Sequence, residues 1–129
     1  MIDHAAVERW LAAYVAAWKS YDREAIAALF AEDVTVRYHP YDEPIRGRDA
    51  VVESWFGAGE GAPSTDAEGT YDANYHPVAI DGDLAVAVGV STYTDPAVVY
   101  DNCFLVRFDA DGRCREFTEW YIERPGPEA

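Results

Sequence analysis

The chain has 129 residues, half of them hydrophobic and 14% aromatic, and its formal net charge is −14 at pH 7. So acidic a chain is not expected to bind nucleic acid or an anionic membrane surface, because both need clustered Lys and Arg. The length fits one domain with a core of its own. We expect a single domain over residues 1–129, with a frayed tail from about residue 125.

The chain carries no sign of a membrane span or a secretory signal. No apolar run approaches the ~18 residues that a membrane helix needs, and the first residues have no basic region leading into an apolar stretch. Cys103 and Cys114 are too few for a disulfide framework. These features predict a cytoplasmic protein with free thiols.

Three helices are expected in the first half of the chain. Asp3 can cap the first, and apolar residues then recur at helical spacing to about Ser20: Val7, Trp10, Leu11, Tyr14, Val15 and Trp18. Asp22 caps a shorter second helix, whose expected buried residues are Ile26, Leu29 and Phe30. A third helix is predicted over about 48–56, carrying Val51, Val52, Trp55 and Phe56.

The rest of the chain is predicted to form strands. Alternating apolar and polar residues predict a strand over 34–38. After a Gly- and Pro-rich loop over 57–69, which suits a pocket mouth or an idle surface loop, strands follow over 70–80, 84–94, 98–108 and 113–123. Helices followed by consecutive hairpins indicate an α+β fold with the helices packed on one sheet face.

Three segments carry a resemblance to a known family: residues 14–36, residues 44–51 and the last hairpin around 106–113. In this order and spacing they resemble the nuclear transport factor 2-like superfamily, in its SnoaL-like and ketosteroid-isomerase-like branch. The resemblance implies three N-terminal helices packed on a strongly curved antiparallel sheet that forms a cone-shaped pocket, a cystatin-like α+β roll. This fold hosts isomerases, dehydratases, cyclases and proteins without catalysis, so it does not name a reaction.

Alternation along each strand predicts which side chains face the pocket. On the last hairpin, a turn at 110–111 would pair residues whose numbers add up to about 221. The expected inward residues are, strand by strand, Tyr38; Asp72, Asn74 and His76; Val86, Val88, Val90 and Thr92; Asn102, Phe104 and Val106; and Arg115, Phe117, Glu119 and Tyr121.

The catalytic set of the isomerases is only partly present. By resemblance, Tyr14 matches the tyrosine of the first helix that stabilises an enolate, although it also suits plain core packing. Tyr38 stands where those enzymes carry the general-base aspartate, and Phe104 stands where they carry a second acidic group. Steroid isomerisation by that route is therefore not expected.

Other groups could move a proton. His39 and His76 have ordinary pKa values near neutrality. Glu119 would be a carboxylate in an apolar wall, where burial raises the pKa unless the group is paired, and Arg115 is its expected structural partner. The spacing of the histidines does not favour a metal site, and no cofactor is expected.

These observations predict a SnoaL-like pocket protein for a small, largely apolar organic ligand. Its catalysis would be proton transfer next to a carbonyl by Tyr14 with His76, His39 or Glu119. The alternatives are a ligand-binding module without chemistry and a dimeric interaction domain. The further ligand-contacting residues expected are Trp18, Tyr38, Trp55, Val88, Asn102, Phe104 and Tyr121.

A homodimer is also expected. The other face of strand 84–94 carries small, nearly uncharged side chains, which suit packing against a second copy. These are Ala85, Ala87, Gly89, Ser91 and Tyr93.

Overall fold

The computed structural model describes residues 2–57, 69–94 and 97–125. Its helices are α1 (His4–Ser20), α2 (Arg23–Ala28) and α3 (Arg48–Ser54). Its strands are β1 (Phe30–Arg37), β2 (Ile45–Arg46), β3 (Tyr71–Asp81), β4 (Leu84–Thr94), β5 (Ala97–Phe108) and β6 (Cys114–Glu123). The α+β class is confirmed. Most of the expected loop over 57–69 and of the expected tail lies outside the described residues.

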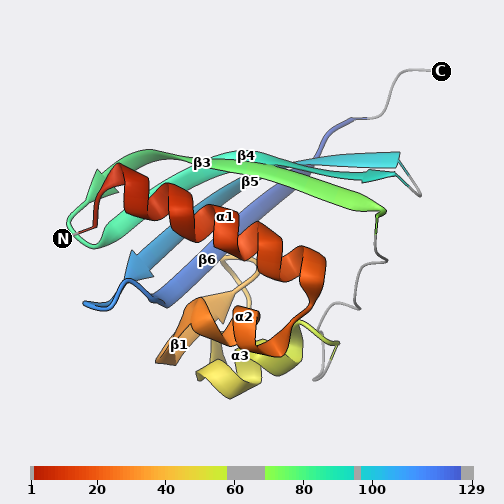
Figure 1. Ribbon diagram of the computed structural model, residues 1–129. Coiled ribbons are helices and arrows are strands. Elements are labelled where there is room, and N and C mark those ends of the chain that lie inside the picture. The colour runs from red at the N-terminus through yellow and green to blue at the C-terminus, as the bar shows by residue number, and fades with distance from the viewer. Residues whose placement is uncertain (1, 58–68, 95–96, 126–129) are drawn as a thin grey trace.

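The strands form one curved, six-stranded sheet in the order β2-β1-β6-β5-β4-β3. The long strands β3 to β6 are antiparallel hairpins, whereas β1 runs parallel to β6, so the sheet is mixed rather than wholly antiparallel. Helix α1 lies across β3, and α2 and α3 lie beside β1 (Figure 1). The helices and the concave face of the sheet therefore enclose the core.

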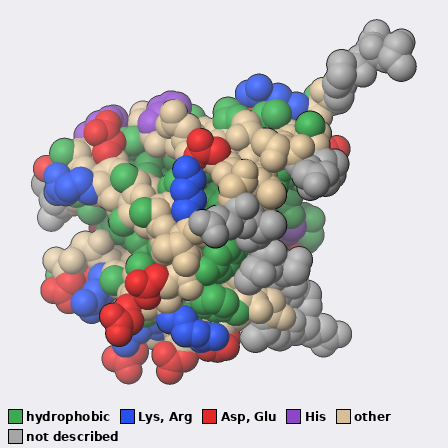
Figure 2. Space-filling view, turned by 45° about the vertical axis from the view of Figure 1, so that its right-hand side comes forward, with side chains coloured by type: hydrophobic (Ala, Val, Ile, Leu, Met, Phe, Trp, Pro, Cys, Tyr) green, Lys and Arg blue, Asp and Glu red, His purple; other side chains and the backbone are tan. Residues whose placement is uncertain are grey.

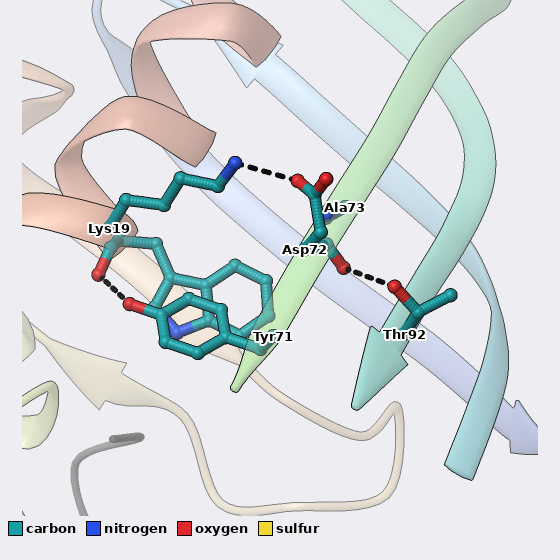
Figure 3. A network of polar contacts seen from close by, with 6 residues as sticks. Lys19, Tyr71, Asp72, Ala73 and Thr92 are labelled. Atoms are coloured by element: carbon teal, nitrogen blue, oxygen red, sulfur yellow. Dashed lines mark hydrogen bonds and ion pairs between the residues drawn. The ribbon is translucent and has the colours of Figure 1, made fainter. Parts of the chain in front are cut away.

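Helix α1 is held at both ends. The Asp3 carboxylate accepts from the Ala6 backbone N–H at 2.8 Å, as an N-cap should. At the other end the Lys19 ammonium lies 2.7 Å from the Asp72 carboxylate, and the Tyr71 hydroxyl donates to the Trp18 carbonyl at 2.6 Å (Figure 3). These contacts fix the last turn of α1 on β3.

The second helix is shorter than expected, because α2 ends at Ala28 and Phe30 already begins β1. Phe30 pairs with Cys114 of β6 and is buried. Its side chain is in the core as predicted, but its backbone belongs to the sheet. The strand expected over 34–38 therefore begins four residues earlier.

A bulge in β3 reverses the predicted face of the strand. Ile80 packs on the core, but the register shifts between Pro77 and Ala79, and Val78 is 53% exposed. On the N-terminal side of the bulge, Tyr75 and Pro77 face inward, and His76 is exposed on the outer face. The expectation that Asp72, Asn74 and His76 face the pocket is wrong for this reason.

Strand β4 also has the opposite orientation to the one predicted. Its small residues Ala85, Ala87 and Ser91 are buried against the helices, whereas Val86, Val88 and Val90 lie on the other face of the strand. Both faces of this strand are apolar in sequence, so alternation alone could not orient it. The small-residue face proposed for a dimer therefore lies inside the protein.

The last hairpin keeps the predicted faces with a different register. Phe104 pairs with Glu119, and Asn102 pairs with Tyr121, a shift of two residues from the expected partners. A shift of two preserves which side chains point inward. Both cysteines are free thiols, as expected.

No helix in the described part of the chain is long and apolar enough to cross a membrane.

Candidate functional site

A hydrogen-bonded chain of side chains on the concave face ends at Glu119. The Tyr75 and Ser91 hydroxyls are 2.6 Å apart, and Ser91 donates to Oδ1 of Asn102 at 2.9 Å. Nδ2 of Asn102 donates to Oε2 of Glu119 at 2.9 Å. The chain crosses β3, β4, β5 and β6, so the sheet itself orients the Glu119 carboxyl group.

Glu119 lacks the cationic partner that the sequence suggested. Arg115 is exposed, and its guanidinium lies 2.9 Å from the Asp83 carboxylate. The irregularity near the start of β6 places Arg115 on the opposite face of the strand from Glu119. Burial raises the pKa of Glu119 to about 8, and the hydrogen bond from Asn102 partly offsets this rise. The group therefore titrates near neutrality.

Tyr14 projects from α1 into the same region. Its ring is surrounded by Trp10, Trp55, Phe104 and Phe117, with centroids 5.2 to 6.2 Å away. Burial, and next the charge of Glu119, hold the pKa of Tyr14 well above its usual value. The phenol is therefore neutral and able to donate a hydrogen bond throughout the physiological range.

The Tyr14 hydroxyl and Oε1 of Glu119 make no hydrogen bond to the described residues, in contrast to their neighbours. Within the described ranges, every side-chain nitrogen or oxygen that is sealed from solvent has a partner. The two groups are therefore not sealed, and both must border space that a water-sized sphere can enter. The Tyr14 hydroxyl and Oε1 of Glu119 are therefore two polar groups of the interior that are available to hydrogen-bond a ligand.

Tyr38 is held by the third helix. Its hydroxyl lies 2.9 Å from the Ser54 hydroxyl, and Ser54 donates to the Val51 carbonyl at 2.6 Å. Burial raises the pKa of Tyr38 to about 12, with smaller opposing effects from Ser54 and Trp55. Tyr38 faces the interior as predicted and stays neutral.

His39 and Tyr121 lie at the rim. The His39 ring packs against Tyr41 and Tyr121, with centroids 5.3 and 4.6 Å away, and its Nδ1 is 3.2 Å from the Asp42 carboxylate. Tyr121 is 39% exposed and also meets Tyr100 edge to face at 5.4 Å. The imidazole is thus engaged with a surface carboxylate.

The other expected site residues divide into two groups. Trp55, Phe104 and Asn102 face the concave side, and Trp18 packs on Tyr71 at 4.4 Å, where α1 ends on β3. His76 and Val88 are paired neighbours on the outer face of the sheet, so they do not share a site with Glu119. The predicted convergence of His76 with Glu119 and Tyr14 is therefore wrong.

Sequence reasoning missed Tyr75 and Ser91. Both belong to strands whose faces were reversed, Tyr75 by the bulge in β3 and Ser91 by the ambiguous pattern of β4. The one available signal was Ser91 itself, since a hydroxyl among Ala85, Ala87 and Gly89 needs a partner if that face is buried.

Two other kinds of site find no support. No group of three or more His, Cys, Asp or Glu side chains that could hold a metal ion occurs among the described residues. A groove of about 660 Å³ lies between the start of α1 and the turn at 109–112. Asp83 in the lining of this groove is already paired with Arg107 and Arg115.

On the face drawn in Figure 2, acidic side chains gather at the lower edge, toward the short helices.

Comparison with known proteins agrees with this architecture. The model of the SnoaL-like domain matches residues 11–117. The chain belongs to the SnoaL-like domain family. Its α+β fold is the one that a solved nuclear transport factor 2-like structure also has. A search of curated proteins found no match.

Solved structures of this SnoaL-like fold include two from bacteria. A protein from Kribbella flavida DSM 17836, described as a proposed ketosteroid isomerase, superposes with a TM-score of 0.67 at 20% identity, covering 98% of this chain and 85% of that one. A nuclear transport factor 2-like protein of unknown function from Burkholderia xenovorans LB400 gives 0.68 at 18% identity, covering 95% and 89%. At these identities the likeness concerns the fold.

Proposed function

We propose that this SnoaL-like protein binds a small, largely apolar carbonyl compound on its concave face and moves a proton on the carbon next to the carbonyl. The observation that carries the proposal is the pair of free polar groups in the aromatic interior. One is the Tyr14 hydroxyl, and the other is Oε1 of Glu119. The aromatic walls supply apolar contact, and two polar groups supply orientation, as is typical of small-molecule sites.

The two groups suit different parts of such a reaction. A pKa of about 8 lets Glu119 both give and take a proton near neutral pH, which is where a general acid–base group is most effective. Glu119 would take a proton from the α-carbon and return it to a neighbouring atom. Tyr14 would donate a hydrogen bond to the carbonyl oxygen, which strengthens as negative charge develops there.

The chemistry differs from that of the standard steroid isomerase in its acid–base residue. Tyr38 and Phe104 replace the two acidic groups, and Phe104 is a buried core residue. Among the three candidates for the proton-moving group, His76 lies outside and His39 is paired with Asp42 at the rim. Glu119 is the candidate that the described geometry supports.

The proposal can be tested without knowing the natural substrate. The protein is incubated with 2-tetralone in D₂O, and exchange of the α-hydrogens is followed by proton NMR. We expect accelerated exchange in the wild type. Glu119→Gln should lower the rate about 10²–10⁴-fold, the usual range for loss of an acid–base group. Tyr14→Phe should lower it with a small effect on Kd.

Tyr41→Phe provides the control, because Tyr41 is 82% exposed and its ring packs on His39 at the rim, outside the aromatic interior. The Tyr41→Phe variant should exchange the α-hydrogens of 2-tetralone at the wild-type rate. Binding of 2-tetralone without accelerated exchange would contradict catalysis and support the ligand-binding module instead. If Glu119→Gln exchanged at the wild-type rate, the assigned base would be wrong.

A further inference from the structure

The direction of the hydrogen bonds around Glu119 determines what the interior can still offer to a ligand. The Ser91 hydroxyl has one hydrogen, which it donates to Asn102. The 2.6 Å contact between Tyr75 and Ser91 must then use the hydrogen of Tyr75. Tyr75 is therefore a committed donor, while its oxygen keeps its capacity to accept.

The same reasoning applies to Tyr38, with a different result. Ser54 donates its hydrogen to the Val51 carbonyl, so Tyr38 must donate to Ser54. The Trp55 indole N–H donates to the Tyr38 oxygen as well. The Tyr38 hydroxyl therefore both donates and accepts a hydrogen bond within the protein. Of the two tyrosines, Tyr75 has the oxygen that is more available to accept from a ligand.

Tyr14 is the remaining free donor. It has a hydrogen that no described residue accepts, whereas Glu119 accepts from Asn102 through Oε2 and keeps Oε1 for the proton that it would move. The rings of Tyr14 and Tyr75 are neighbours, with centroids 6.4 Å apart. One donor and one acceptor therefore lie on neighbouring rings, and neither group is cationic.

We propose that the ligand is a hydroxylated cyclic ketone, whose carbonyl oxygen accepts from Tyr14 and whose hydroxyl group donates to Tyr75. This inference rests on the proposed function and adds a second recognition point to it. A carbonyl alone would leave the Tyr75 oxygen unmatched in a desolvated site. An anionic ligand would meet no positive charge in this network and would lie beside a carboxyl group.

The test compares 2-tetralone with its isomers hydroxylated at each aromatic ring position, and with the matching methoxy compounds. Affinities are measured by quenching of tryptophan fluorescence. We expect at least one hydroxyl isomer to bind about three- to tenfold more tightly than 2-tetralone, which is the usual contribution of one added hydrogen bond. The methoxy compound at that position should lose the gain, because it has no hydrogen to donate.

Variants identify the partner. In Tyr75→Phe the ratio of Kd between 2-tetralone and the preferred hydroxyl isomer should fall to about one, whereas Tyr41→Phe should keep the wild-type ratio. Ketones that bind without any gain from a hydroxyl group would overturn this inference and leave the proposed function standing. A gain that persists in Tyr75→Phe would also overturn it. Failure of every ketone to bind would overturn both.

Discussion

At the scale of single residues, two opposing effects set the protonation of Glu119. Burial favours the neutral acid, and the hydrogen bond from Asn102 favours the carboxylate. Asn102 is in turn held by Ser91, so its amide presents nitrogen rather than oxygen to Glu119. Asn102 is therefore a positioning residue for Glu119.

Replacing Asn102 should shift this balance toward the neutral acid. In Asn102→Leu, which keeps the branching at Cγ and has no donor, the pKa of Glu119 should rise above about 8. Its proton affinity should increase tenfold or more, because a hydrogen bond to a charged group contributes about 1.5–3 kcal/mol. The measurement is a pH titration of the Glu119 carboxyl carbon by ¹³C NMR.

Ser91→Ala serves as the comparison, because it keeps the amide donor and removes the group that orients it. Its effect on the pKa of Glu119 should be smaller than that of Asn102→Leu. If Asn102→Leu left the pKa of Glu119 unchanged, the hydrogen bond would not be part of the balance.

Several inward residues of the site could be predicted from the sequence, and the reasons are physical. Tyr14 lies on a long helix with strong periodicity, and Glu119 lies on a strand where Phe117 fixes the inward face. The predicted register between β5 and β6 is wrong by two residues, and a shift of two leaves the predicted inward and outward faces of both strands correct. The expected partner of Glu119 was Arg115, and it is wrong because the irregularity near the start of β6, which spacing along one strand does not reveal, leaves Arg115 bound to Asp83 and Asn102 as the partner.

At the scale of elements, the faces of β3 and β4 were beyond prediction from alternation. One extra residue at Val78 reverses the rest of β3, and the neighbouring Pro77 does not by itself reveal the bulge, because a Pro suits an edge strand as well. On β4 valines alternate with alanines, so both faces are apolar. The small residues face the helices and Tyr75, and the valines face outward.

Gly89 on β4 is required by this packing. A Cβ atom there would lie 2.0 Å from the Asn74 carbonyl oxygen and 2.6 Å from Cδ1 of Tyr75. Because one of these contacts is with the backbone, a rotamer change cannot relieve it. Gly89→Ala should destabilise the fold by about 1–3 kcal/mol or more, the usual cost of overpacking.

The free energy of unfolding is measured by urea denaturation. Gly82→Ala is the comparison, because a Cβ at Gly82 meets open space and only its positive φ of 63° adds strain, so its cost should be about 1 kcal/mol. Equal losses in the two variants would contradict the close packing around Gly89.

At the scale of the whole molecule, the carboxyl group of Glu119 makes stability depend on pH. The pKa rises from an ordinary value of 4.5 to about 8 on folding, so the folded state binds the proton more tightly. This contribution is fully present below pH 4.5 and is lost as pH rises through 8. Between these limits the free energy of unfolding should fall by at most about 1.4 kcal/mol per pH unit.

Glu119→Gln isolates this effect, because it is isosteric and does not titrate. The difference in the free energy of unfolding between wild type and Glu119→Gln should decrease from pH 5 to pH 8 and level off above that, as measured by urea denaturation at each pH. A difference that is constant with pH would mean that the pKa of Glu119 is the same in the folded and unfolded states.

The outer face of the sheet is the surface we propose for a homodimer, in place of the buried face of small residues. Trp120 and Ile122 on this face are 38% and 71% exposed, and Asp101 beside Ile122 is paired with Arg124. Val88, Cys103 and Trp120 form one row across β4, β5 and β6. A chain with a net charge of −14 repels its copies, so association is favoured where acidic groups are few.

Sedimentation should therefore show a dimer at micromolar concentration. Trp120→Glu should give a folded monomer, because it would place two like charges in a desolvated contact. Tyr41→Glu, on an exposed side chain elsewhere, should remain dimeric. A monomeric wild type would contradict this assembly.

The position of β6 has a consequence for how the protein is made. The last strand of the chain lies inside the sheet, between β1 and β5, and β1 and β2 reach the other strands only through it. Until β6 has been synthesised, β1 is paired with β2 alone among the described strands, and β5 presents an open edge. The sheet can therefore be completed only once β6 is available, and in that interval the two unpaired edges are open to aggregation.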